Sequence, residues 1–508
     1  MDPTEALPDD ALANILRRLE PCELAASRCV RKAWCAVVDA HGLMRPHILP
    51  SSVRGLFVNY IDYERPRFFA RPTTKRPAIN GDLGFLPGYN EGFDPIVDHC
   101  NGLLIYRIKW TDFCVVNPAT RRWERLPHLD ACNYNAYLAF DPAVSLHYQV
   151  FAIPLVPDKK PFWKPKIPSQ EPYCLLELFL LLEDASALES FEEESEDGPS
   201  ELSTERTIEE DDDLPTIFTP SPPIECSVKQ DDSDDLVEWP PSSWTLDVFS
   251  SSTKQWQKRT FVREGEALET LASVRLDRVE PTSWGPRWRY AVYWGGSLYV
   301  HCRGAFVVRL LLQDGKYQLV KTPIDIEESK HAEPCLGKSE KGVYFATVQH
   351  GYQLRVWILH ESGGQMSWEL KHHTNLNPSV TINLNHPKGI DHKTWFLYGD
   401  NDEEGTNGMP ESDKFEWNSD DDNVLNIEDG YEFYSYVSIL GFHPYKEIVF
   451  LELSSFKGVA YHLKNSKVSK VQYLGKLRPK DYTHLQTNGI YESFPYTPCM
   501  VGELSESA

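Results

Sequence analysis

The sequence lacks the features of a secreted or membrane-spanning protein. Its 11 cysteines are scattered, odd in number and never spaced as Cys-x-x-Cys, which argues against a disulfide scaffold or a zinc ribbon. The N-terminus, MDPTEALPDD, is acidic where a secretory signal would be basic and then apolar. The longest apolar run, Cys174–Leu182, has nine residues and contains Glu177, whereas a bilayer span needs ~20 residues. We therefore expect a protein of the cytoplasm, the nucleus or both, without membrane contact.

The motifs of several large enzyme classes are also missing. The sequence has no GxSxG elbow, no GxxxxGKS or GxxxxGKT phosphate-binding loop and no GxGxxG turn. His372, His373 and His386 could indicate a metal site, but they lie in a polar stretch without paired carboxylates at ligand spacing. We interpret them as loop histidines and expect no catalytic residue, no bound metal and no cofactor.

Negative charge is concentrated in two segments. The whole chain carries a net charge of −24, and Glu183–Glu238 alone has 21 acidic residues against 2 basic ones. Asp400–Glu432 has 13 acidic residues and one lysine, so the remaining chain is slightly positive. The overall charge therefore describes two insertions and not the folded surface, and it argues against a dedicated nucleic-acid-binding protein. The first insertion is too polar to offset its ordering entropy and should be disordered, whereas the second keeps three aromatic residues and should be partly ordered.

The first forty residues have the periodicity of helices. Leu12, Ile15, Leu16 and Leu19 follow the i, i+3, i+4, i+7 spacing of one apolar helix face. Pro21 then stands where it can open a second helix, at a first-turn position that needs no N–H donor. So short a stretch buries too little surface to be stable alone. The pattern by itself indicates a small helical cap on the domain that follows.

The order of residue types in this stretch resembles the F-box, the helical module that binds the Skp-type adaptor of cullin–RING ubiquitin ligases. The matching positions are Leu7, Pro8, Ile15, Leu16, Leu19, Leu24, Arg28, Val30, Lys32 and Trp34. Two positions depart from the family pattern, with Glu20 in place of the usual proline and Arg31 in place of a frequent cysteine. The resemblance implies that Trp34 closes the module's own core and that the adaptor contacts Leu7, Pro8, Leu12, Ile15, Leu16, Leu19, Leu24, Val30 and Lys32.

After His41 the helical period gives way to a repeated hairpin pattern. An apolar, β-rich run is followed by a polar turn and by an aromatic residue that opens the return strand. The pattern appears at Phe113–Trp123, Leu246–Trp256, Val307–Tyr317 and Leu354–Trp368. Further apolar strands are predicted at Cys100–Tyr106, Gly295–Cys302, Lys341–Val348, Lys446–Leu453 and Gly458–Leu463. Units of three or four strands at a spacing of roughly 40–50 residues are typical of a β-propeller.

We therefore predict an N-terminal all-α module followed by an all-β domain, a β-propeller of about six to eight blades with two acidic insertions. A β-sandwich, which repeats less regularly, is the alternative fold. The first insertion should interrupt a blade between strands at Tyr173–Leu182 and Trp244–Phe249. The predicted divisions are the helical module 1–45, three propeller parts 46–182, 239–399 and 433–500, the insertions 183–238 and 400–432, and a tail 501–508.

Four phrases in the β-rich part extend the resemblance to a large plant, especially grass, group of F-box proteins with a propeller-like associated domain. They are DHCNGLL (Asp98–Leu104), NPATRRW (Asn117–Trp123), LGFHPYKEIVFL (Leu440–Leu451) and YTPC (Tyr496–Cys499). The resemblance implies a non-catalytic substrate receptor that docks on the Skp–cullin–RING scaffold and holds an unidentified target protein. The alternative function is a carbohydrate-binding or hydrolytic propeller with a helical cap, in which the Trp-rich hairpins line a sugar cleft. Tryptophan at a recurring strand position is more simply explained as packing between blades.

The acidic insertion should contribute little to stability. Replacing Glu183–Glu238 with a short Gly/Ser linker should leave the melting temperature almost unchanged, because loop-closure entropy grows only by ~0.6 kcal/mol per doubling of loop length. Thermal unfolding of the two proteins compares them directly. A large drop in melting temperature, or slow amide exchange across Glu192–Asp213 in the intact chain, would show that the segment is structured.

Overall fold

The computed structural model describes the helical module in part and most of the β-rich region. The described residues are 7–19, 24, 27, 30–41, 43, 52–60, 63–70, 79, 81, 83–86, 95–108, 112–129, 134–156, 236–277, 290–376, 395–397, 436–453, 456–463, 471–479 and 489–499. The predicted disorder of the first acidic insertion and the predicted partial order of the second therefore concern residues that lie outside this set, apart from 236–238. No helix within the described ranges is long and apolar enough to cross a membrane.

Two helices stand where the N-terminal periodicity predicts helical structure. Helix α1 spans Asp9–Leu16, and α3 spans Lys32–Ala40. Asp9 and Asp10 lie in the first turn of α1, where their negative charge suits the positive end of the helix dipole. The two helices pack against each other through a small apolar core formed by Leu12, Ala13, Leu16, Leu24, Val37, Val38 and Leu43.

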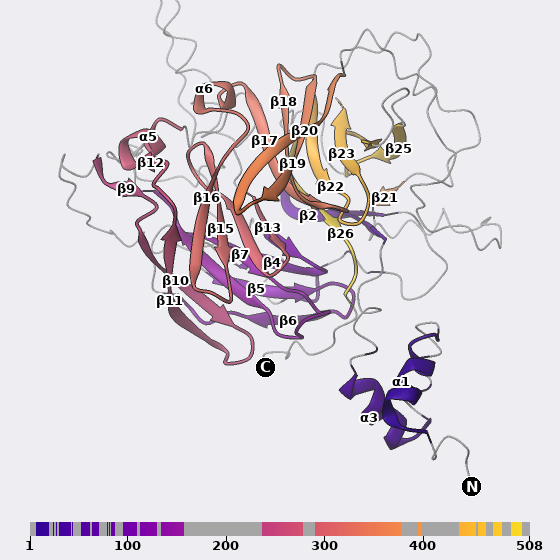
Figure 1. The fold of residues 1–508 in the computed structure, drawn as a ribbon. Coiled ribbons are helices and arrows are strands. Elements are labelled where there is room, and N and C mark those ends of the chain that lie inside the picture. The colour runs from indigo at the N-terminus through magenta and orange to yellow at the C-terminus, as the bar shows by residue number, and fades with distance from the viewer. Residues whose placement is uncertain are drawn as a thin grey trace, which may run out of the picture. The chain divides into compact units, whose positions relative to one another are not determined.

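The β-rich region contains six four-stranded antiparallel units among the described residues (Figure 1). Unit I consists of β26 (Ile490–Tyr496), β1 (Gly55–Tyr60), β2 (Tyr63–Ala70) and β21 (Phe396–Leu397). Unit II consists of β3 (Ile96–Cys100), β4 (Leu103–Ile108), β5 (Asp112–Asn117) and β6 (Arg122–Arg125). Unit III consists of β7 (Tyr134–Ala139), β8 (Gln149–Pro154), β10 (Ser243–Ser250) and β11 (Gln255–Glu264).

The other three units follow in chain order. Unit IV consists of β13 (Ala291–Trp294), β14 (Ser297–His301), β15 (Phe306–Leu311) and β16 (Lys316–Lys321). Unit V consists of β17 (Ala332–Ser339), β18 (Gly342–Gln349), β19 (Gln353–Ser362) and β20 (Gln365–Asn375). Unit VI consists of β22 (Val437–Phe442), β23 (Ile448–Leu453), β24 (Lys457–His462) and β25 (Val471–Lys476). A short parallel pairing between β11 and β16 joins units III and IV into one eight-stranded sheet.

The hydrophobic cores show how these units are arranged. Each of six apolar clusters takes its side chains from two units, and the pairs are I with II, II with III, III with IV, IV with V, V with VI, and VI with I. Because the sixth interface joins unit VI back to unit I, the six units form a closed ring. Each unit has one innermost strand, its first strand, and the first strands contact one another around the inside of this ring. They are β3, β7, β13, β17, β22 and β26. Sheets stacked radially around an axis are the arrangement of a β-propeller, and the two facing sheets of a β-sandwich are not present.

The predicted hairpins are confirmed, and all four occupy the same place in their units. Each one joins the third strand to the fourth, as β5–β6, β10–β11, β15–β16 and β19–β20. The aromatic residue of each return strand lies opposite an apolar residue of the third strand, in the pairs Val116–Trp123, Phe249–Trp256, Leu310–Tyr317 and Leu359–Trp368. The hairpin pattern that repeats in the sequence therefore corresponds to a cross-strand aromatic–apolar pair that repeats in the structure.

One of the two strands predicted on either side of the first insertion lies in the described part of the chain. Trp244–Phe249 belongs to β10, which pairs with β11 along its whole length and with β8 through its last four residues. The other predicted strand, Tyr173–Leu182, lies outside the described residues, so the predicted position of the insertion stays a prediction.

The predicted C-terminal end of the insertion is wrong by a few residues. Glu238 and Trp239 form β9, a short strand that pairs with β12 (Glu269–Thr270) just before helix α5 (Leu271–Arg275). The Glu238 carboxylate binds the Arg263 guanidinium at 2.5 Å. Glu238 therefore belongs to the folded part, and a linker replacement should end at residue 235.

Ring closure depends on the two ends of the β-rich region. In unit I, the late strand β26 pairs with the early strand β1 along their whole length. The residues that follow β26 then bind unit II, where the Asn117 amide donates to the Cys499 carbonyl at 2.9 Å. The Tyr496 hydroxyl accepts the Ala119 N–H at 3.2 Å. A Cβ on Gly102, which has a φ of +86°, would lie 2.5 Å from the Cys499 side chain, so this turn needs glycine.

The substitution Asn117→Ala should weaken this closure. It removes the donor to the buried Cys499 carbonyl, at a cost of about 1–3 kcal/mol, and one of the two acceptors of the Ala119 N–H, which keeps its bond to the Tyr496 hydroxyl. The midpoint of urea unfolding should fall accordingly. Asn135→Ala is the matched control, because the Asn135 amide bonds only to Tyr137 in its own strand. Equal midpoints for the two variants would contradict the proposed closure.

Candidate functional site

The helical module exposes an apolar and basic surface at part of the predicted adaptor-binding positions. Ile15 is 51% exposed and Val30 is 64% exposed, so both leave apolar area open to a partner. Leu7 is 37% exposed, and Pro8 and Lys32 are exposed as well. These five residues can contact a partner without any rearrangement of the module. Their contact with an adaptor stays a prediction.

The remaining predicted contact residues lie inside the module. Leu12, Leu16 and Leu24 are fully buried and form its core with α3, and Leu19 is half-buried against the same core. In this structure these four residues pack inward, and their predicted contact with an adaptor stays a prediction. The i, i+3, i+4, i+7 stripe mixes the two roles, since only Ile15 of its four members points to solvent.

Trp34 lies at the edge of that core. Its ring is half-buried and packs against the buried cluster, and the Arg31 guanidinium lies 5.7 Å from the ring centroid. A cation at this distance is attracted by the aromatic face. Arg31, which departs from the family pattern, thus supports Trp34 from the outside.

The recurring tryptophans do not line a cleft. The Trp256 indole N–H donates to the Pro127 carbonyl at 2.7 Å, and the Trp368 indole N–H donates to the Lys321 carbonyl at 2.9 Å. Each bond runs from the fourth strand of one unit to the end of the fourth strand of the preceding unit. Trp123, Trp256 and Trp368 also pack against the apolar clusters between units. They hold the units together, and they are not available as a sugar-stacking platform.

His372, which was considered as a metal ligand, has another partner. One of its ring nitrogens lies 2.9 Å from the Tyr461 hydroxyl, which joins β20 to β24 of the next unit. Within the ranges that the structure describes, no group of three His, Cys, Asp or Glu side chains is placed to hold a metal ion. His386 lies outside those ranges.

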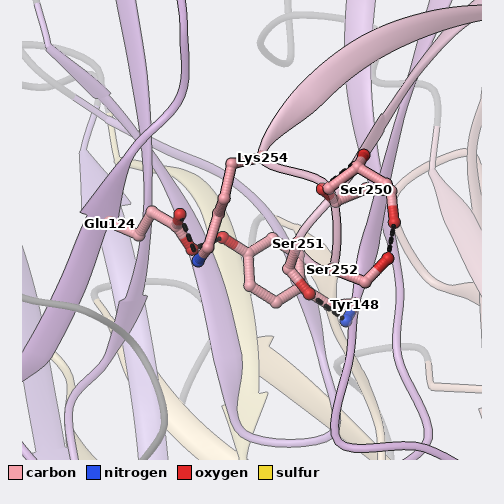
Figure 2. A network of polar contacts seen from close by, with 7 residues as sticks. Glu124, Tyr148, Ser250, Ser251, Ser252 and Lys254 are labelled. Atoms are coloured by element: carbon pink, nitrogen blue, oxygen red, sulfur yellow. Dashed lines mark hydrogen bonds and ion pairs between the residues drawn. The ribbon is translucent and has the colours of Figure 1, made fainter.

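A polar network between units II and III has no free catalytic group (Figure 2). The buried Glu124 carboxylate accepts the Tyr148 hydroxyl at 2.6 Å and binds the Lys254 ammonium at 2.5 Å. The Ser251 hydroxyl accepts the Tyr148 N–H at 2.9 Å, so the turn after β10 is fixed to the start of β8. Burial first, and the negative charge of Glu124 second, raise the pKa of Tyr148 and keep its hydroxyl protonated. The network is a structural clamp.

Three glutamates from different strands have raised pKa values. Burial raises the pKa of Glu333 to about 7 and that of Glu452 to about 8, and it holds the pKa of Glu492 well above the ordinary value. Ser438 bonds to Glu333, and the Tyr436 hydroxyl lies 3.5 Å from Glu452. No sequence motif indicates these residues, because they are far apart in the chain and lie on strands of three different units.

A cavity lies where the first strands meet. Its walls come from β3, β13, β17, β22 and β26 together with the turns that follow them. The polar lining residues near those turns are Asn101, Tyr293, Lys338, Tyr445 and Thr497. The volume open to the centres of water-sized molecules is about 80 Å³, which is room for a few waters or for one small group of a ligand.

Lys338 is the residue that carries charge into this cavity. Burial raises the pKa of Asp98 to about 8, although the Leu138 N–H donates to its carboxylate at 2.6 Å, so Asp98 is mostly protonated at neutral pH. Burial, and then the nearby Lys338, lower the pKa of His99 to about 4, so this imidazole is neutral. Burial raises the pKa of the Cys100 thiol to about 11. Among the described lining residues, the Lys338 ammonium is therefore the dominant charge.

The sequence contains these residues in the phrases DHCNGLL, LGFHPYKEIVFL and YTPC but does not reveal that they share a cavity. Asn101 follows β3, Tyr445 follows β22 and Thr497 follows β26, so they come from three units. Part of the phrase DHCNGLL has a plain structural role, because Cys100 and Asn101 both donate to the Phe140 carbonyl of the next unit. Lys338 lies in no recognisable phrase.

The substitution Leu16→Asp should unfold the helical module and leave the β-rich region folded. Burying a carboxylate at a position that is 1% exposed costs several kcal/mol, more than a core of this size can supply. Trp34→Ala should destabilise the same module by ~3 kcal/mol, at the lower end of large-to-small core changes because the ring is half-buried. Hydrogen exchange of α1 and α3 measures both effects. Protected helices in Leu16→Asp would contradict the core assignment.

Solved structures with a remote likeness to this chain include three that cover most of it. A periplasmic gluconolactonase of Pseudomonas aeruginosa matches at 10% identity with a TM-score of 0.33, covering 83% of this chain and 82% of that one. YCF48 bound to D1 peptide matches at 8% identity with a TM-score of 0.28, covering 85% and 84%. A prolyl endopeptidase matches at 9% identity with a TM-score of 0.26, covering 92% of this chain and 54% of that one. No functional conclusion follows from likenesses of this size.

The comparison with protein families gives one match. No curated protein matches the chain. Residues 5–45 match the F-box domain, and this range contains α1, α3 and every one of the predicted adaptor-binding residues. The match covers the helical module and none of the β-rich units. The N-terminal module is thus similar to the F-box domain, in agreement with the order of its residue types.

Proposed function

We propose that the protein is the substrate-recognition subunit of a Skp–cullin–F-box type ubiquitin ligase. The observation that carries this proposal is the F-box match over residues 5–45, because F-box domains bind Skp-type adaptors. The exposed positions Leu7, Ile15 and Val30 support it, since they offer apolar area to a partner. In this function the module docks on the adaptor and, through it, on the cullin and RING subunits.

The β-rich region then serves as the target-binding part, a propeller whose six units we count as six blades. It contributes no chemistry of its own and raises the local concentration of the target beside the ubiquitin-conjugating enzyme. The carbohydrate-binding or hydrolytic alternative loses its main support, because the recurring tryptophans are occupied between units. We propose that the protein acts in the cytoplasm, the nucleus or both. We also propose that it belongs among the plant F-box proteins that its sequence resembles.

Co-purification of a Skp-type adaptor with the full chain tests the proposal, and Ile15→Asp is the decisive variant. A charge at this exposed position should abolish adaptor binding because the interface cannot offset a buried carboxylate, while the module itself stays folded. Replacing Leu7-Pro8 with Ala-Ala should weaken binding in the same way. Asn14→Asp, an equal charge change at the neighbouring exposed position, is the control. Undiminished adaptor binding by Ile15→Asp with protected helices would end the F-box interpretation.

A further inference from the structure

We propose that the cavity at the end of the first strands binds a carboxylate group presented by the target protein, with the Lys338 ammonium as its counter-charge. The binding group is either the carboxylate at the C-terminus of a target segment or that of an Asp or Glu side chain. The inference rests on the proposed function only in naming a target protein as the source of the ligand.

Lys338 has no counter-charge in the part of the chain that the structure describes. Its Nζ donates to the Asn101 side-chain oxygen at 2.5 Å, and no carboxylate lies within ion-pair distance. This ammonium is only partly exposed, and a partly buried charge whose one partner is a neutral amide is poorly compensated. An ammonium has three N–H donors, so two remain for a ligand in the cavity.

The cavity supplies further donors beside Lys338. Thr497 is 4% exposed and lines the cavity, and its buried hydroxyl has no hydrogen-bond partner among the described residues. Burial raises the pKa of Tyr445 to about 12, and burial also raises that of Tyr293, so both phenols keep their protons at neutral pH. Buried polar groups are normally paired in folded proteins. An anion would satisfy the Thr497 hydroxyl and the lysine together.

Two acids compete for this role, Asp98 and Asp141. Asp98 lines the cavity, but its carboxylate accepts the Leu138 N–H at 2.6 Å and burial raises its pKa to about 8. The negative charge of Asp141 acts on Tyr293 and Tyr445, so Asp141 lies near the same end of the cavity. Its carboxylate, however, accepts the Ala143 N–H at 3.0 Å within its own loop. It does not line the cavity and forms no ion pair with Lys338.

The charge and size of the site favour a carboxylate over a phosphate. The lining residues include one lysine and no arginine, whereas a phosphate dianion is usually held by several cations or by the bidentate fork of arginine. The apolar part of the lining, which includes Val292, Leu336 and Phe442, can accommodate little more than a small apolar group beside the anion. A single negative charge at the tip of a peptide or of a side chain meets both conditions.

The position of the cavity suits a peptide ligand. It lies at the end of the ring where the first strands finish, next to the turns after β3, β13, β17 and β22. Trp294, at the β13–β14 turn, is 37% exposed, and Val144, in the loop after β7, is 65% exposed. These side chains can contact the residues of a segment whose last group enters the cavity.

Binding of defined peptide pools to the purified full chain tests the inference. Three pools of N-acetylated hexapeptides, whose random positions exclude Asp and Glu, are compared on the immobilised protein: one has a free C-terminal carboxylate, one is amidated and has one fixed glutamate, and one is amidated and has a fixed glutamine in its place. We expect enrichment from the first or the second pool over the third, and the enriched pool identifies the source of the carboxylate. Equal retention of all three pools would overturn the inference.

Enriched peptides are then synthesised singly and their Kd is measured by fluorescence polarisation. Lys338→Met should weaken binding about 10- to 100-fold, the usual effect of removing a charged hydrogen-bond partner, and Lys338→Arg should restore part of it. Thr497→Val should weaken binding by a smaller factor. Lys321→Met removes an exposed lysine outside the cavity and should leave Kd unchanged. Wild-type affinity in Lys338→Met would overturn the inference.

The same preparations separate this inference from the proposed function. Adaptor co-purification is measured on each variant, and the thermal midpoint shows whether the β-rich region is folded. A protein that binds the adaptor but retains the three pools equally refutes the carboxylate site and leaves the ligase assignment standing. A protein that selects carboxylate peptides but never binds an adaptor refutes the ligase assignment alone.

Discussion

The structure depends on the fact that no unit of the β-rich region can bury both of its faces alone. A four-stranded sheet has two apolar faces here, and each face is covered only by the next sheet in the ring. The core between units VI and I and the core between units I and II both need unit I, so the pairing of β26 with β1 at the junction of the chain's two ends completes the ring. The Asn117 amide, which donates to the Cys499 carbonyl, and the Tyr496 hydroxyl, which accepts the Ala119 N–H, then fix the closing strand against unit II. The cavity and its lysine are consequences of the same closure.

Local pattern was enough to predict the strands, and it failed where pairing is decided by distant segments. The hairpins follow from alternating apolar residues and a polar turn, which are local, and the four predicted examples all lie in the structure as third and fourth strands. The pairing of β10 with β8 joins segments on either side of the first acidic insertion, and no local pattern indicates it. Lys338 and Thr497 line the same cavity only because the ring closes, so no spacing in the sequence could have indicated that they share a site.

The helical module shows the same limit on a smaller scale. Helical periodicity predicted which residues share one face of α1, but Leu12 and Leu16 face α3 while Ile15 faces solvent. A stripe of four leucine or isoleucine residues is wider than the core of two short helices. Which member is left outside is decided by the position of the second helix, and the sequence of the first helix does not contain that information.

The chain order of unit I has a consequence for biosynthesis. The ribosome releases β1 and β2 early, but their neighbour β26 is among the last segments to be made. Until then β1 has a free edge, and the faces between units VI and I and between units I and II are incomplete. The helical module precedes all of this in the chain. Chaperones or quality-control factors that bind the nascent chain at this stage therefore meet a docking module whose small core is marginal and a ring whose apolar faces are uncovered.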